Sequence, residues 1–173
     1  MAIVINGSGT VTGISVGGLP DGIVDAGTLA TNSVDSAELI DGSIDDSHLA
    51  TDGTISAVNL KDFGYVTNAI GSIGGGTQDI NLTLGNSVSG TVDTSTTTFT
   101  FSNPTASDEL CAFALTLTNG GSQTVNFPAT VDWAGGTAPT LTTAGVDILV
   151  FATIDGGTIW HGFAAALDSK TPS

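Results

Sequence analysis

The feature that most constrains this chain is a short internal repeat between residues 22 and 60. Its four units read VDAGTL, VDSAEL, IDDSHL and ISAVNL, and each opens on Val or Ile and closes on Leu five positions later. Successive units start ten, ten and eleven residues apart. A unit this short cannot bury its own two apolar side chains. It therefore needs neighbouring units along the chain, or copies from other chains.

Each unit predicts an extended step followed by a single helical turn. In the second unit Asp35 occupies a helix N-cap position, and Glu38 follows at the spacing of a capping box. The turn signal Asp41-Gly42 then ends the helix. Helical turns this short do not persist alone in water, because helix nucleation is costly.

We therefore interpret residues 22–62 as a shaft in which three parallel chains intertwine. Its apolar positions form the predicted trimer core: Val24, Leu29, Val34, Leu39, Ile44, Leu49, Ile55 and Leu60. The alternative is a flexible repetitive linker, but a linker has no need of periodic leucines.

The charge balance limits the partners of this chain. It has 17 acidic residues against two lysines, Lys61 and Lys170, for a formal net charge of −15. Binding to nucleic acid requires basic groups that displace counterions from phosphates, so no nucleic-acid partner is expected. An anionic membrane surface would repel the chain, and no apolar run is long enough for membrane insertion. The first residues, MAIVINGSG, do not have the pattern of a secretory signal, so synthesis in a cytoplasm is expected.

The remaining segments predict a mainly β protein. Residues 1–21 are expected to form two short strands around Asn6-Gly7, and the resemblance described below implies that they are an attachment segment. Residues 63–76 combine an apolar knot with a glycine run, residues 74–76, which we interpret as a hinge. Residues 77–167 alternate apolar and polar residues between frequent turn signals, which is typical of an antiparallel β-sandwich. Residues 168–173 form a short tail.

Searches for catalytic and metal-binding patterns give no candidate. His48 and His161 each lack a second ligand at metal-binding spacing, and Asp45-Asp46 lacks the alternating oxygen ligands of a calcium loop. No two carboxylates pair in the sequence at the spacing of a glycosidase. Cys111, the only cysteine, excludes an intrachain disulfide and alternates with apolar residues like a buried core thiol. We therefore expect no metal, no cofactor and no enzymatic activity.

Aromatic residues are the remaining candidates for a binding surface. Trp133, Trp160 and His161 are the predicted contacts for a glycan, which would stack on exposed rings. Trp160 and His161 are adjacent, however, and neighbouring residues of a strand point to opposite faces. Core packing or a trimer interface is the favoured interpretation of the tryptophans.

Several of these motifs together resemble a known group of proteins. The repeats, with turns such as LIDGSI and LATDGTI, are similar to the ADGAVTxxKI units in the tail fibres and related virion appendages of tailed phages. The opening, INGSGTVTGISVGGLPDG, is similar to N-termini of that group. The segment containing VNFPATVDWAGGTAPTLT and VDILVFATIDGGTIWHG resembles a C-terminal β-module of phage fibres. The usual lysine of the repeat is replaced here by Glu38, His48 or Asn59, so charge pairing by that lysine is not carried over.

The resemblance implies a non-enzymatic structural protein located in the virion. It would be a homotrimer whose N-terminal part docks onto other phage structural proteins, in the tail or at an adaptor. Its C-terminal β-domain would project for host-surface adhesion, or would position a receptor binder. Two alternatives stay open: a capsid decoration or cement protein that stabilises the phage head, and a carbohydrate-binding module for host surface polysaccharide.

Overall fold

The computed structural model describes Asn59 and residues 61–170. Residues 61–170 belong to a compact unit, Leu60–Ser173. The predicted attachment segment, nearly all of the predicted shaft and all eight predicted trimer-core residues lie outside the described residues.

The described part is mainly β, as predicted, with short 3-10 turns between strands. The strands are β1 (Thr67–Ile73), β2 (Gly76–Asn81), β3 (Ser87–Val92), β4 (Thr97–Ser102), β5 (Ser107–Thr118), β6 (Val125–Asn126), β7 (Val131–Trp133), β8 (Val146–Asp155) and β9 (Trp160–Ser169). The 3-10 turns are η2 (Leu82–Leu84), η3 (Gly120–Ser122) and η4 (Ala134–Gly136).

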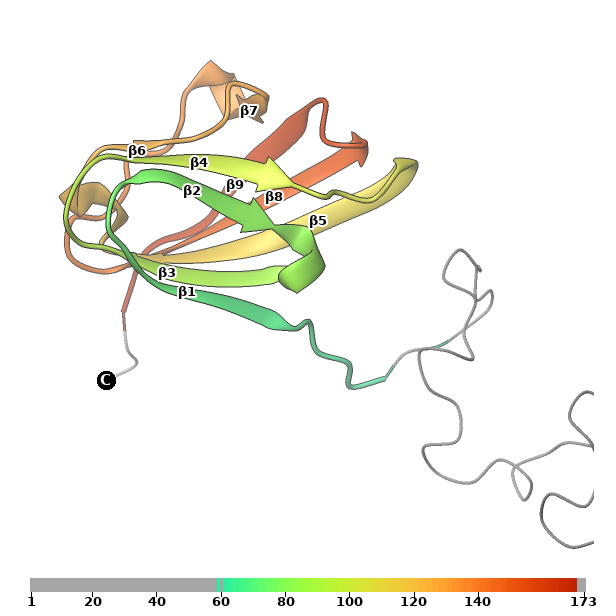
Figure 1. The fold of residues 1–173 in the computed structure, drawn as a ribbon, viewed down its shortest axis with the longest axis horizontal. Helices are drawn as coiled ribbons and strands as arrows, with labels where there is room; N and C mark the ends of the chain where they lie inside the picture. Colours follow the sequence, from blue (N-terminus) through green and yellow to red (C-terminus); the bar gives the residue numbers. More distant parts are fainter. Residues whose placement is uncertain (1–58, 60, 171–173) are drawn as a thin grey trace, which may run out of the picture. The chain divides into compact units, whose positions relative to one another are not determined.

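These strands form two sheets between which the chain alternates (Figure 1). Sheet A has six strands in the order β1-β3-β5-β8-β9-β7, and sheet B has three strands in the order β2-β4-β6. From β1 to β6 each strand is followed by one in the other sheet, so that neighbours within a sheet run parallel. The chain then completes sheet A with β8 and β9, which pair antiparallel to β5 and to each other.

The prediction of an antiparallel fold is therefore wrong for most strand pairs. Alternation of apolar residues reports that one face of a strand is buried, but it carries no information on strand direction. Turn signals between strands likewise do not say which sheet the chain enters next. In the structure they lead the chain into the opposite sheet, which makes successive strands of one sheet parallel.

The glycine run at residues 74–76 is a corner within this fold rather than the predicted hinge before it. It connects β1 of sheet A to β2 of sheet B. Gly75 and Gly76 have φ of 93° and 77°, values that favour glycine. A Cβ on Gly75 would lie 1.9 Å from the Ser95 hydroxyl oxygen, so no larger residue fits this corner without a shift. The predicted apolar knot just before β1 is exposed, at Phe63, Tyr65 and Val66.

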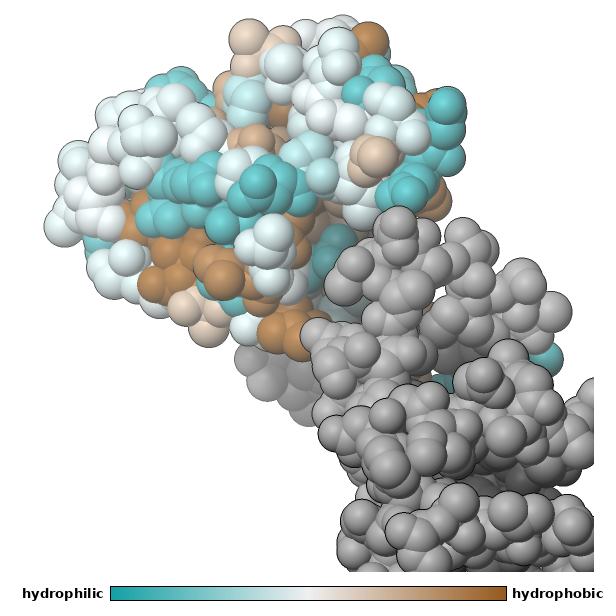
Figure 2. Space-filling view, turned by 45° about the vertical axis from the view of Figure 1, so that its right-hand side comes forward, coloured by the Kyte–Doolittle hydropathy of each residue, from teal (hydrophilic) through white to brown (hydrophobic). Residues whose placement is uncertain are grey.

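One hydrophobic core is built from the inward side chains of both sheets. In β5 the buried positions alternate through Cys111, Phe113, Leu115 and Leu117, which confirms the predicted burial of the cysteine. Other large apolar side chains are exposed, and hydrophobic and hydrophilic residues are unevenly distributed over the surface. In Figure 2 a brown hydrophobic region lies below a teal hydrophilic band.

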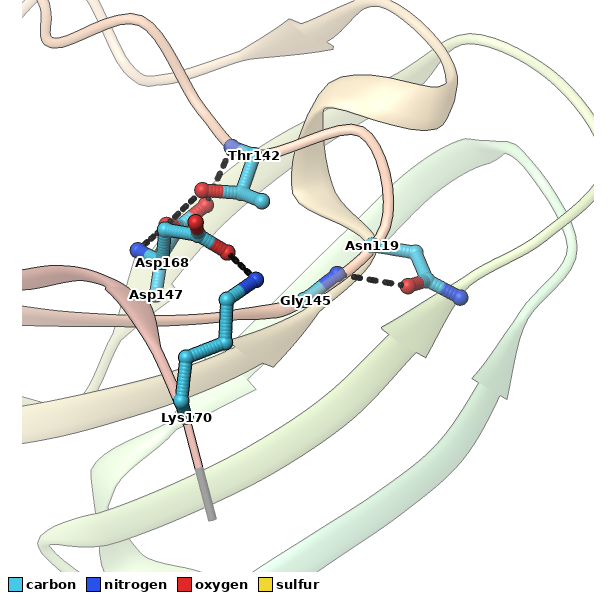
Figure 3. Close-up of polar contacts among 6 residues, drawn as sticks. All are labelled: Asn119, Thr142, Gly145, Asp147, Asp168 and Lys170. Atoms are coloured by element: carbon cyan, nitrogen blue, oxygen red, sulfur yellow. Dashed lines mark hydrogen bonds and ion pairs between the residues drawn. The ribbon is translucent and has the colours of Figure 1, made fainter. Parts of the chain in front are cut away.

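The buried carboxylate of Asp147 in β8 connects β8 by hydrogen bonds to β9 and to the loop before β8 (Figure 3). The backbone N–H and the hydroxyl of Thr142 each donate to it at 2.7 Å, and the backbone N–H of Asp168 in β9 donates at 3.0 Å. Burial acts to raise the pKa of Asp147, but the three hydrogen bonds outweigh it and hold the pKa below its ordinary value. The same corner is tied by Asn119, whose side-chain oxygen accepts from the Gly145 N–H at 3.2 Å.

We predict that Asp147→Asn destabilises the β-domain at neutral pH. Its amide cannot accept from all three donors, and leaving a buried donor unpaired costs about 1–3 kcal/mol. The free energy of unfolding, measured by urea titration, should fall by that amount. Asp132→Asn is the control, because Asp132 is exposed on β7, and it should change the stability little.

The same variant tests a pH dependence. Because the folded pKa of Asp147 is lowered, its contribution is complete above the unfolded pKa of about 3.9 and is lost as the pH falls through the lower folded pKa. The stability difference between wild type and Asp147→Asn should therefore shrink in acid. A difference that stays constant down to the lowest pH of folding would contradict this assignment.

Candidate functional site

The predicted glycan contacts do not form one surface. Trp160 is buried, with 2% of its surface exposed, whereas His161 beside it is exposed on the opposite face of β9. Trp133 is partly buried and packs against Phe127 and Phe151, with ring centroids 5.1 and 5.5 Å apart. Trp160 is thus not a surface contact but a core residue, which agrees with the interpretation that the sequence favoured, because strand alternation turns its side chain into the core.

Trp160 belongs to an aromatic cluster that joins the two sheets. Phe101, from β4 of sheet B, has its ring centroid 5.0 Å from those of Phe113 and Phe151 and 5.4 Å from that of Trp160. These three partners come from β5, β8 and β9 of sheet A. The sequence shows four aromatic residues in separate segments, but it does not indicate that their rings contact one another in the core.

A hollow of about 340 Å³ lies beside β9. Its lining residues are Trp133, Ala134, Thr137, Pro139, Gly162, Phe163 and Ala164. Gly162 admits the Trp133 ring, since a Cβ there would lie 2.8 Å from two ring carbons. Phe163 is 54% exposed. Trp133 is thus the predicted glycan contact that does line a hollow, together with Phe163, another aromatic candidate for sugar stacking.

The outward-facing residues of β5 and β8, in the middle of sheet A, form an uncharged patch. Alternation of burial in the long strands defines its outward residues. They are Leu110, Ala112, Ala114, Thr116 and Thr118 in β5, and Val146, Ile148, Val150, Ala152 and Ile154 in β8. Ala114 is the register partner of Val150, and Ala112 is the partner of Ala152. Neither strand contributes a charged side chain to these outward positions.

A second hollow, of about 530 Å³, lies on this uncharged face. Its lining residues are Phe63, Gly64, Tyr65, Asn86, Ser87, Ala112, Phe113, Ala114 and Val150. Phe63 and Tyr65, which pack edge to face with ring centroids 5.7 Å apart, form its rim from the segment before β1. Sequence reasoning grouped these two aromatics as an apolar knot, but it did not connect them to β5 and β8.

The outer face of sheet B is polar and satisfies its own hydrogen bonds. The Asp79 carboxylate on β2 accepts from the Thr100 hydroxyl at 2.8 Å and from the Ser102 hydroxyl at 2.6 Å. Asn81 accepts from the Asn103 amide at 2.9 Å and from the Thr83 hydroxyl at 2.8 Å. The two sheets therefore present outer faces of opposite character.

Other carboxylates hold corners and turns. Asp93 accepts from the Ser72 and Thr94 hydroxyls, and these hydrogen bonds lower its pKa. Asp155 accepts from the Ile159 N–H at 3.0 Å and from the Thr153 hydroxyl at 2.8 Å, which likewise lowers its pKa. A general acid at neutral pH requires a raised pKa, so both shifts are opposite to that role.

Metal sites and membrane spans were sought in the same residues. Within residues 61–170 no three His, Cys, Asp or Glu side chains gather as metal ligands. The described helical turns include none long and apolar enough to cross a membrane.

No family model, curated protein or solved structure matches this chain. The resemblance to phage appendages therefore stays a prediction from sequence motifs.

We predict that Trp160→Ala destabilises the β-domain strongly. Truncating a buried tryptophan typically costs about 3–5 kcal/mol, and here it also removes the contacts with Phe101 and Phe113. Urea unfolding followed by circular dichroism would measure the loss. Phe163→Ala is the matched control on the same strand and should cost far less, because its ring is exposed. Equal effects of the two substitutions would contradict the core assignment.

Proposed function

We propose that this chain is a non-enzymatic structural protein of a tailed-phage virion, a homotrimeric tail fibre or appendage. The observation that carries the proposal is the repeat of Val or Ile and Leu at ten-residue spacing, followed along the chain by a β-domain. Such a repeat requires other copies to bury its apolar residues.

The architecture of the β-domain supports a structural role. Its strands share one core, and its carboxylates at Asp79, Asp93, Asp147 and Asp155 accept hydrogen bonds from nearby strands and turns. Groups fixed in this way stabilise a rigid module. A rigid module suits a part that projects from a particle and holds a surface in position.

In this proposal the N-terminal part docks onto other virion proteins and the β-domain points outward. The net charge of −15 suits an exposed appendage, because it favours solubility and opposes unspecific association. The β-domain would then adhere to the host surface, or would position a separate receptor binder.

We predict that the purified full chain has the solution mass of three chains, measured by light scattering. Virions labelled with an antibody against the β-domain should be decorated at the tail, with a low copy number per particle. A mass of one chain would contradict the trimer. Label over the whole head at high copy number would instead establish the capsid decoration protein that the sequence left open.

A carbohydrate-binding role is a second candidate, favoured by the hollow between Trp133 and Phe163. The exposed ring of Phe163 and the partly buried ring of Trp133 offer an apolar surface on which a sugar ring can stack. The hydroxyl of Thr137 and nearby backbone groups would supply hydrogen bonds. The ligand would be a host surface polysaccharide.

For this second role we predict that Phe163→Ala weakens adsorption to host polysaccharide about tenfold, since loss of an interface aromatic costs more than about 1 kcal/mol. Leu167→Ala is the control, as an exposed apolar residue of β9 that does not line the hollow. Unchanged adsorption of Phe163→Ala, with unchanged thermal stability, would exclude the hollow as the glycan site.

A further inference from the structure

We infer that the outer face of sheet A, centred on Ala114 and Val150, packs against a second copy of this chain. The inference rests on the proposed trimer and specifies which surface of the β-domain faces the neighbouring copies. No established interface includes this face.

The first step is the composition of the face. Ala114 and Val150 are register partners at the middle of β5 and β8, and Ala112 and Ala152 form the next outward pair. Sheets with one solvated face normally alternate apolar residues inward with polar residues outward. Here the outward positions are also apolar or weakly polar. Contiguous apolar surface of this kind marks an interaction site.

The second step is the distribution of charge on the domain, which favours a second copy as the partner of this face. Carboxylates lie on the described surfaces around this patch: Asp79 on the outer face of sheet B, Asp93 after β3, Asp108 and Glu109 at the start of β5, Asp132 on β7, and Asp155 at the end of β8. The whole chain has two lysines to pair with 17 acidic residues, so two copies meeting through those surfaces would repel each other. The outward face of β5 and β8 meets a second copy without that repulsion. A basic partner protein would instead favour the acidic surfaces.

The third step is shape. The small side chains of Ala112, Ala114 and Ala152 keep the centre of the face shallow, and two sheets that pack face to face lie about 10 Å apart. The hollow of about 530 Å³ on the same face can receive a protruding side chain. Phe63 and Tyr65 at its rim are 59% and 67% exposed, and both are side chains that interfaces bury.

The fourth step is continuity along the chain. Leu60, the last predicted residue of the trimer core, precedes Phe63 by three positions. Phe63 and Tyr65 in turn line the hollow with Ala114 and Val150. Association of three chains through the repeat would therefore raise the local concentration of this face, because Leu60 lies only three positions before Phe63. The same copies can then bury both apolar surfaces.

The test is cysteine crosslinking in the full chain. Val150→Cys places a thiol at the centre of the face, and Thr98→Cys places one on the exposed outer face of sheet B as the matched control. Wild type is the blank, because its single cysteine, Cys111, is buried. A short bismaleimide, which joins two thiols, should link Val150→Cys chains into covalent dimers, and should leave Thr98→Cys unlinked. Ala114→Cys, at the register partner, should behave like Val150→Cys and serves if that variant folds poorly.

The outcomes separate this inference from the proposed function. A three-chain mass with Val150→Cys and Ala114→Cys unlinked and freely reactive would overturn the interface while leaving the trimer in place. A one-chain mass would overturn both. Linking of Thr98→Cys in preference to the sheet A variants would place the interface on sheet B and also overturn the inference.

Discussion

The packing of Phe101 against Phe113, Phe151 and Trp160 is the contact on which the β-domain depends. Sheets A and B are separate hydrogen-bonded units, so no strand ladder connects them. Their association rests on the shared core, and edge-to-face aromatic pairs add about 0.5–1.5 kcal/mol each beyond the area they bury. Phe101 of β4 contacts β5 in the opposite sheet, and β8 and β9, which follow β5 in that same sheet, supply the other aromatic contacts.

Asp147 holds the last strand, β9, in place. A buried carboxylate is costly unless its oxygens are hydrogen-bonded, and here donors from Thr142 and Asp168 supply those bonds. The acidic composition of the chain is thus partly structural. Asp79 performs the related task of linking β2 to β4 through hydroxyl groups, and Asp155 closes the turn before β9.

Sequence alternation predicted the strands and the buried positions of β5, including Cys111, because period-two burial is written directly into the residue order. It did not predict parallel pairing, since direction depends on which sheet the chain enters after each corner. The glycines at residues 74–76 looked like a hinge because a tight corner and a flexible linker use the same residue. The uncharged face left a signal that was overlooked: the residues between the core positions of β5, from Ala112 to Thr118, are themselves uncharged.

The outer faces of the two sheets differ in polarity where β2 and β4 of sheet B are compared with β5 and β8 of sheet A. On sheet B a carboxylate and hydroxyl groups satisfy one another and remain compatible with water. On sheet A the equivalent positions include Ala114 and Val150, which gain nothing from water. A chain with this much negative charge has ample means to make every face polar. The outward face of β5 and β8 is nevertheless uncharged, and it lies next to the exposed rings of Phe63 and Tyr65. Burial of that face by other copies, as inferred above, explains both the missing charges and the exposed aromatic rings.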